Sequence, residues 1–151
     1  MIPTDVQQYL DKHGLKAIEF EEGSTPTAVT AAEKLEVEVG QIAKSILLKG
    51  KNGKFYLVVV AGDKRIDNKK AKALTGAKTR MATAEELFEV LGFKPGEVCP
   101  FRDSEIDYFI DASLAEYDIV YPAAGTDSSG VPLTYDKLTS ITGAGECDIT
   151  V

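Results

Sequence analysis

One lysine interrupts an apolar stretch of the sequence and has no acidic residue close to it in the chain. Lys44 stands in the run Gln-Ile-Ala-Lys-Ser-Ile-Leu-Leu, whose branched residues are typical of a β-strand. Successive side chains of a strand point to opposite faces, so the ammonium of Lys44 can simply point to solvent from an edge. Local sequence alone favours that structural interpretation over a chemical role.

A second candidate for chemistry is the stretch from Gly92 to Asp103. Its two prolines and two glycines break both helices and sheets, so we predict a long, shaped loop. Within it, Gly96 permits close approach of the backbone to a ligand, and exposed backbone amides could polarise a carbonyl oxygen. Many loops have this composition, so the pattern does not by itself indicate a functional site.

The other common catalytic groups are largely missing. His13 is the only histidine, at the predicted end of a short helix, so a nucleophile–histidine pair has one possible base. No zinc-protease, EF-hand, Walker or dinucleotide-binding motif occurs, and Cys99 and Cys147 lack a C-x-x-C spacing. We therefore expect no metal, no cofactor and no disulfide. Hydrolysis of a small ester by His13 or Cys99 stays open, although Cys99 is simpler to interpret as a partly buried loop residue.

Positive charge is concentrated in one segment of an acidic chain. The net charge is -7, which argues against a general nucleic-acid binder. However, 11 of the 17 basic residues lie between Lys44 and Arg80, against only Asp63 and Asp67. This segment is either a solvated face or a surface that holds one polyanion in one orientation. Four of its members are the predicted nucleic-acid contacts: Lys64, Arg65, Lys69 and Lys70.

Helices and strands are interspersed along the chain. Capping residues predict helices that begin at Thr4, after Thr27, after Asp67, after Thr83 and after Thr134, with glycines after most of them. Branched and aromatic runs predict strands at residues 15–20, 42–48, 55–60, 78–81, 108–110, 119–121, 131–133 and 148–151. An Asn-Gly turn makes the second and third of these a hairpin that carries Lys44.

These elements predict an α+β fold in one domain over residues 1–151. Several links between strands are too short for helical crossovers, so antiparallel pairing must be common. We expect a curved, mixed, largely antiparallel sheet, barrel-like and flanked by short helices. The sequence has neither a basic amino-terminal segment followed by an apolar run nor an apolar stretch of about 18 residues. No membrane association and a cytoplasmic location are the corresponding expectations.

A wider pattern of residues resembles the YbaK and prolyl-tRNA synthetase-associated editing domains, in the same order over nearly the whole chain. It consists of Thr27, Ala31-Ala32, Gln41-Ile42-Ala43-Lys44-Ser45, Gly92-x-x-x-Gly96-x-x-x-Pro100-Phe101, Asp111 and Ala123-Ala124-Gly125. The lysine motif and the G-x-x-x-G-x-x-x-P loop are specific as a pair. Two departures concern substrate preference: Ser45 stands where threonine or asparagine is common, and Ala123 replaces a serine.

The resemblance implies that the chain is a free-standing deacylase that hydrolyses the ester of a mischarged tRNA. Lys44 would be an electrostatic anchor, and the backbone of Gly96, Glu97, Val98 and Cys99 would polarise the ester carbonyl. The same resemblance assigns substrate binding to Thr27, Ser45, Gly92, Pro100, Asp111 and Gly125. Asp111 also has a structural interpretation, as the cap of the turn that follows it. The implied partners are the acceptor end of the tRNA and an aminoacyl-tRNA synthetase.

A non-catalytic module of the same fold, which captures tRNA or a synthetase, is the alternative. The expected site contains no irreplaceable side-chain nucleophile, so the residues do not exclude it. An aminoacyl ester is already activated, and a site need only orient it, stabilise the oxyanion and place a water. The amino acid that would be removed is left open by the sequence.

Overall fold

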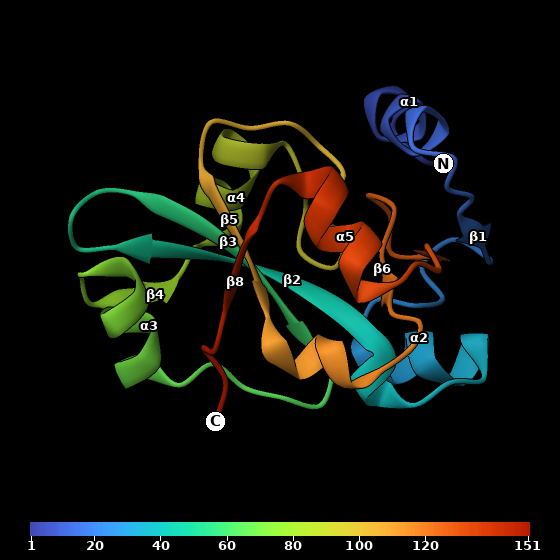
Figure 1. Cartoon of the computed structure of the whole chain (residues 1–151). Coiled ribbons are helices and arrows are strands. Elements are labelled where there is room, and N and C mark those ends of the chain that lie inside the picture. Colours follow the sequence, from blue (N-terminus) through green and yellow to red (C-terminus); the bar gives the residue numbers. More distant parts are fainter.

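The computed structural model describes residues 1–151 and is built around a six-stranded sheet (Figure 1). Five strands run in the order β4-β2-β3-β5-β8, and β6 pairs with β2. Their bounds are β2 (Ile42–Gly50), β3 (Phe55–Ala61), β4 (Thr79–Met81), β5 (Asp107–Asp111), β6 (Tyr121–Pro122) and β8 (Gly145–Cys147). A separate antiparallel pair consists of β1 (Ile18–Glu19) and β7 (Ser129–Gly130).

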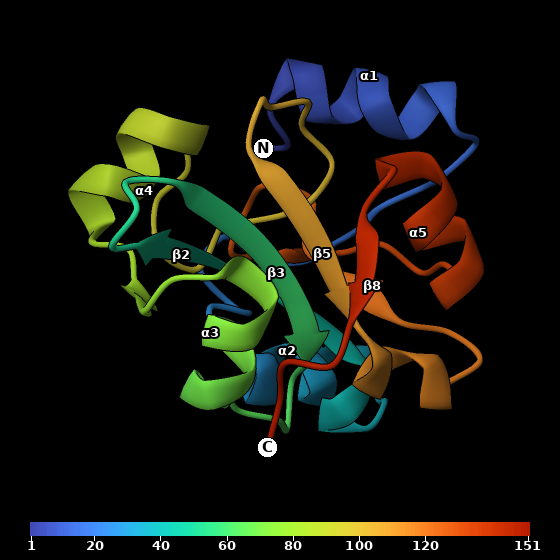
Figure 2. The same ribbon diagram turned by 60° about the vertical axis from the view of Figure 1, so that its left-hand side comes forward.

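The sheet is mixed, as predicted, but it does not close into a barrel. Its longest ladder is the antiparallel hairpin of β2 and β3, and β4 also pairs antiparallel with β2, whereas β5, β6 and β8 join parallel to their neighbours. The two end strands, β4 and β8, have three residues each and lie apart, so neither offers an edge that could complete a barrel. Figure 2 shows the twist of β3, β5 and β8.

Five short helices surround the sheet, and none has the length and hydrophobicity that a membrane span needs. They are α1 (Thr4–Lys12), α2 (Ala28–Leu35), α3 (Asn68–Thr75), α4 (Ala84–Leu91) and α5 (Tyr135–Thr142). The predicted caps are confirmed for the last four: the side chains of Thr27, Asp67, Thr83 and Thr134 each accept a backbone N–H of their helix. The predicted capping box at Thr4 is wrong, because Pro3 precedes α1 and no side chain caps it.

The short strands near the ends of the chain were predicted less well than the hairpin. The strand expected at residues 15–20 has only two paired residues, and of the one expected at 131–133 only Leu133 pairs, in an isolated antiparallel bridge with Val120. At the carboxyl end, β8 lies at Gly145–Cys147, before the expected range of 148–151, within which Thr150 forms an isolated antiparallel bridge with Ile66. In each case the available partner decides which residues pair, because short segments have little intrinsic preference.

The outer edge of β2 is paired at its two ends and open between them. One edge of β2 is filled by β3 from Ala43 to Lys49. On the other edge, β6 pairs with Ile42 and Ala43, and β4 pairs with residues 48–50. The stretch Lys44–Ile46 therefore has no strand beside it on that edge.

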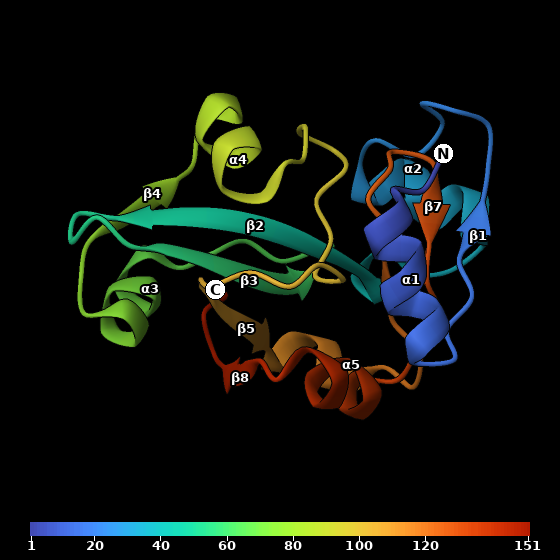
Figure 3. The same ribbon diagram turned by 90° about the horizontal axis from the view of Figure 1, so that it is seen from above.

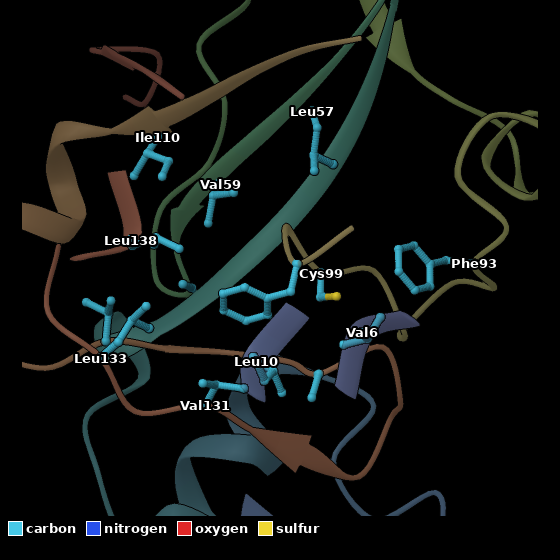
Figure 4. Packing of buried hydrophobic residues seen from close by; sticks show 14 of the residues in the cluster. Val6, Leu10, Leu57, Val59, Phe93, Cys99, Ile110, Val131, Leu133 and Leu138 are labelled. Carbon is cyan, nitrogen blue, oxygen red and sulfur yellow. The ribbon is translucent and has the colours of Figure 1, made fainter. Parts of the chain in front are cut away.

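Hydrophobic residues cover both faces of the sheet, and the larger cluster fixes the loop of residues 92–103, called the Gly/Pro loop below. Twenty buried residues on one face draw on α1, α4 and α5 (Figure 4). Six buried residues on the other face draw on α3. Phe93, Cys99 and Phe101 belong to the larger cluster and are buried almost completely. Residues on both sides of Gly96 are thus inserted into the core, and the loop between them is held against the sheet.

Candidate functional site

A small cavity of about 110 Å³ lies beside the open edge of β2. Its walls come from four separate parts of the chain: the segment that enters α2, the start of β2, the Gly/Pro loop and the region of β6 and β7. The lining residues are Thr25, Pro26, Thr27, Ala28, Ala31, Leu35, Ile42, Ala43, Lys44, Ser45, Gly96, Val98, Tyr121, Ala123 and Ser129. Lys44, Ser45, Thr27, Gly96 and Val98 are thereby brought together from positions up to 71 residues apart.

Lys44 is the only cation that lines this cavity. Its side chain takes part in none of the four salt bridges of the molecule. Partial burial lowers the pKa of Lys44, and the nearby carboxylate of Asp63 opposes this shift without cancelling it. The ammonium is thus partly desolvated and free to pair with an anion from outside the protein.

Ser45 contributes a hydroxyl that has no partner. Its Oγ is shielded from solvent and forms no hydrogen bond within the protein, although the residue lines the cavity. A buried hydroxyl without a partner costs stability, and such exceptions often mark a place where a ligand or water completes the bonding. Ser45 therefore has an unused hydrogen-bonding group in the wall of the cavity.

The backbone of the Gly/Pro loop presents two free amides at the cavity. Gly96 has a left-handed backbone with φ of 86°, and a β-carbon there would lie 3.5 Å from the carbonyl oxygen of Pro26. The N–H of Glu97 donates to the carbonyl oxygen of Lys94 at 3.0 Å, so this amide is occupied by a turn. The amides of Gly96 and Val98 have no acceptor in the protein. These two, rather than Glu97, can donate to a ligand.

Four of the predicted substrate-binding residues lie outside the cavity, as do Glu97 and Cys99 of the predicted catalytic residues. Gly92 ends α4 with φ of 74°, and Gly125 is packed against Pro3 and Phe93. Pro100 lies in a different surface hollow, which is lined also by Tyr108. None of these three residues lines the cavity. The fourth is Asp111.

Asp111 ties the carboxyl-terminal residues to the sheet. Its carboxylate accepts hydrogen bonds from the N–H of Ile149 at 2.7 Å, the hydroxyl of Thr150 at 2.9 Å and the N–H of Ser113 at 3.1 Å. Burial raises the pKa of Asp111, but the hydrogen bonds from Ile149, Ser113 and Thr150 outweigh it and hold the pKa below its usual value. The turn cap expected from the sequence is present, together with a longer-range anchor.

The two residues that could act as a nucleophile or base elsewhere are poorly placed for it. Burial raises the pKa of the Cys99 thiol to about 12, and no part of this residue reaches the surface. His13 follows α1 and stacks at 5.0 Å from the ring of Tyr9, outside the cavity. Hydrolysis through either residue is therefore not supported.

Asp127 and Ser129 were not identified from the sequence. The carboxylate of Asp127 accepts the N–H of Gly23 at 3.1 Å, and its carbonyl oxygen accepts both the N–H and the hydroxyl of Thr25 at 2.8 Å. Ser129 Oγ accepts the hydroxyl of Thr126 at 2.7 Å and lines the cavity. Hydroxyl residues after Gly125 were a usable signal for a hydrogen-bonded loop, but their position opposite α2 depends on the tertiary fold.

The predicted nucleic-acid contacts lie outside the cavity. Lys64 and Arg65 follow the end of β3, and Lys69 is exposed in the first turn of α3. Lys70 is engaged by Asp148 at 3.0 Å and by the carbonyl oxygen of Thr150 at 2.8 Å. No group of His, Cys, Asp and Glu side chains is arranged to hold a metal ion.

Comparisons with known proteins agree with this fold and show the family. Residues 22–141 match the family model described as the aminoacyl-tRNA editing domain. Protein YwhH of Bacillus subtilis is 39% identical over 120 residues, which cover 78% of this chain and 75% of that protein. The proline–tRNA ligase of Staphylococcus haemolyticus is 31% identical over 123 residues, which cover 79% of this chain but only 21% of the ligase.

Solved structures extend the similarity to the whole chain. A crystal structure described as a candidate trans-editing enzyme for prolyl-tRNA synthetase has a TM-score of 0.88 and 35% identity, and covers 100% of this chain and 99% of that one. The crystal structure of the hypothetical protein APE2540 has a TM-score of 0.89 at 27% identity, with 97% and 99% coverage. The chain belongs to the aminoacyl-tRNA editing domain family.

Proposed function

We propose that this protein is a deacylase that hydrolyses the ester between a wrongly attached amino acid and the terminal ribose of a tRNA. The observation that supports it best is the meeting of Lys44, the free amides of Gly96 and Val98, and the unpartnered hydroxyl of Ser45 at one cavity. The membership of the aminoacyl-tRNA editing domain family supports the same substrate class.

The size of the cavity favours a substrate that enters only in part. A volume of about 110 Å³ holds the equivalent of roughly four waters at about 30 Å³ each. It can admit a small amino-acid side chain, whereas a nucleoside must stay at the mouth. Editing by exclusion of the larger, correct amino acid follows, since a synthetase pocket separates side chains that differ by one methylene by only about 1 to 3 kcal/mol.

Each polar group then has a distinct part in the reaction. The Lys44 ammonium pairs with the phosphate of the terminal nucleotide and so orients the ester. The amides of Gly96 and Val98 donate to the carbonyl oxygen and stabilise the negative charge that forms on it when water adds. The alcohol of the ribose is the leaving group and takes up the proton, with its vicinal hydroxyl able to assist. No side-chain nucleophile is required.

The synthetase that supplies the substrate is proposed from the relatives. The chain spans about a fifth of the proline–tRNA ligases that it matches, and a similar solved protein is described as acting for prolyl-tRNA synthetase. We therefore propose mischarged tRNA for proline as the first substrate to test, and the cytoplasm as the place of action. Lys64 and Arg65, which follow β3 on the side of Lys44, are proposed contacts for the acceptor end.

The direct test is incubation of the purified protein with a panel of tRNAs that carry different amino acids. Release of a small amino acid, faster than the spontaneous rate and with the correctly charged tRNA spared, is the expected result. Binding without release would instead support a non-catalytic module. Release from no member of the panel, at protein concentrations above that of the tRNA, would overturn the proposal.

A change of Ser45 to alanine should affect activity and stability in opposite directions. The substitution removes a buried hydroxyl without a partner, so the free energy of unfolding should stay level or rise by up to about 1 kcal/mol. We expect kcat/KM for deacylation to fall roughly tenfold, because one hydrogen bond of about 1.4 kcal/mol to the bound substrate is lost. Thermal unfolding and kinetics on the same preparation measure both. A loss of stability in parallel with activity would contradict the role given to this hydroxyl.

A further inference from the structure

A hollow with a basic lining lies at the end of β2 that is remote from Lys44. It has a volume of about 550 Å³ and is lined by Lys49, Gly50, Lys51, Gly53, Lys78, Thr79 and Arg80. Four of these seven residues are cations, and none is acidic, although the chain as a whole has a net charge of -7. We call this surface the hairpin hollow, because it follows the tip of the β2–β3 hairpin.

The four cations form two rungs on one face of the sheet. Lys49 is paired with Arg80 across β2 and β4, and the N–H of Lys51 donates to the carbonyl oxygen of Lys78 at 2.9 Å. Residues paired in this way direct their side chains to the same face. The rungs are two residues apart, or roughly 7 Å, which is close to two steps of a nucleic-acid strand at about 3.4 Å each along the helix axis.

One carboxylate holds the rung of Lys49 and Arg80 in place without neutralising the hollow. Glu86 of α4 pairs with Arg80 through two hydrogen bonds, at 2.7 and 3.0 Å, and with Lys49 at 3.2 Å. The side chain of Glu86 is 18% exposed, against 54% for Arg80. Lys51 and Lys78 take part in no salt bridge. The hollow therefore keeps an excess of positive charge, with two cations in fixed positions and two free.

The backbone of the hollow indicates the kind of anion that it fits. The amides of Gly50, Lys51 and Gly53 all donate to carbonyl oxygens of the protein, at 2.9 to 3.0 Å. A site for a single phosphate usually offers free backbone amides in a nest or at a helix start, and this one has only cationic side chains. A set of separated cationic side chains without free backbone amides is better suited to a chain of phosphates, in which each phosphate pairs with one cation.

We infer that the hairpin hollow binds the phosphate backbone of the RNA substrate at a fixed distance from the aminoacylated end; the inference rests on the proposed deacylase function. Lys44 and Lys49 are five residues apart on one strand, which spans roughly 17 Å, and this odd spacing directs their side chains to opposite faces of the sheet, so the RNA would pass the open edge of β2 between them. That length corresponds to about five stacked nucleotides at about 3.4 Å each. With the terminal nucleotide at Lys44, the hollow meets the RNA where the unpaired 3′ end joins the acceptor helix. Figure 3 shows β2 connecting the hairpin tip to α2.

Binding of uncharged tRNA by the double variant Lys51→Gln/Lys78→Gln tests the surface without any catalytic step. Both lysines are exposed and unpaired, so the fold should be unaffected. We expect weaker binding, and a plot of log K against log salt concentration whose slope is shallower by about 2. The matched control is Lys12→Gln/Lys16→Gln, which removes two exposed lysines near α1, away from the hairpin (Figure 1). An unchanged slope in the hollow variant, or an equal change in the control, would overturn the inference.

Kinetics with two substrates separate this inference from the proposed function. A mischarged tRNA reaches the hollow, whereas the same amino acid esterified to a CCA trinucleotide does not. The hollow variant should lose kcat/KM on the tRNA and keep the rate of the wild-type protein on the trinucleotide. If the variant and the wild-type protein have equal rates on both substrates, the inference about the hairpin hollow is refuted and the deacylase proposal is unaffected. If the wild-type protein cleaves neither substrate, the deacylase proposal fails, and the salt dependence of binding still decides whether the hollow contacts RNA.

Discussion

Replacing Lys44 by alanine should lower kcat/KM for deacylation of a mischarged tRNA by about 10² to 10³, the loss typical of removing one electrostatic group from an active site. Lys44 is the only charged group that lines the cavity and has no partner inside the protein. Its loss removes the anchor for the terminal phosphate, so both orientation and charge stabilisation suffer. Single-turnover kinetics at saturating protein would measure the effect on the chemical step.

The fold should survive this substitution, which separates it from a general loss of structure. Burial already disfavours the charged form of Lys44, so removal of the ammonium should not decrease the free energy of unfolding. Its pKa is lower than that of a free lysine, and wild-type activity above the spontaneous rate should therefore decline on the alkaline side as the charge is lost. The arginine of Lys44→Arg stays charged at alkaline pH, so the activity of this variant should not decline in that range. Lys16→Ala is the control. If Lys44→Ala is as active as the wild-type protein, the role assigned to Lys44 in deacylation is wrong.

Asp111→Ala is expected to be the most destabilising substitution among the predicted site residues, at about 3 kcal/mol or more. It leaves the buried N–H of Ile149, the partly buried N–H of Ser113 and the buried hydroxyl of Thr150 without their acceptor. The carboxyl-terminal residues would then detach from β5, beside which Ile149 is fully buried. Chemical unfolding followed by circular dichroism would give the change in free energy.

The pH dependence of stability gives an independent check on Asp111. The pKa of this carboxyl is lower in the folded protein than in the unfolded chain. Its contribution is therefore complete above about pH 4, the unfolded value, and is lost as the pH falls through the folded value. Asp111→Ala should flatten this acid limb, whereas Asp107→Ala, an exposed carboxylate on the same strand, should leave it unchanged. An Asp111→Ala protein as stable as the wild type would show that its hydrogen bonds are replaced by water.

Local signals were sufficient to predict several helices and the central hairpin of the fold. Thr27, Asp67 and Thr83 cap helices because each side chain meets the amides of its own first turn. The Asn52-Gly53 turn and its flanking apolar runs were enough for the hairpin, because its two strands are adjacent in the chain. Such features depend on neighbours a few residues away and can be inferred without the tertiary structure.

The interior of the site depends on contacts that local patterns do not contain. The amide of Glu97 is occupied because it closes a turn with the carbonyl oxygen of Lys94. The amides of Gly96 and Val98 remain free. The absence of a partner for Ser45 Oγ depends on what α2 and Ser129 bring to the other side of the cavity. Closure of the sheet was likewise overestimated, because strand length at both ends of a sheet is a property of the assembled fold.

The gap beside Lys44–Ile46 also bears on how the protein resists self-association. An open sheet edge is a template on which a strand of another copy can add, and long open edges promote aggregation. Here β6 and β4 close the edge on both sides, and the N–H of Ala82 donates to the carbonyl oxygen of Leu47, so the opening has only three residues, fewer than the roughly five or six of a typical strand. The main chain of β2 is thus accessible to a small ligand but offers too short a template for another chain.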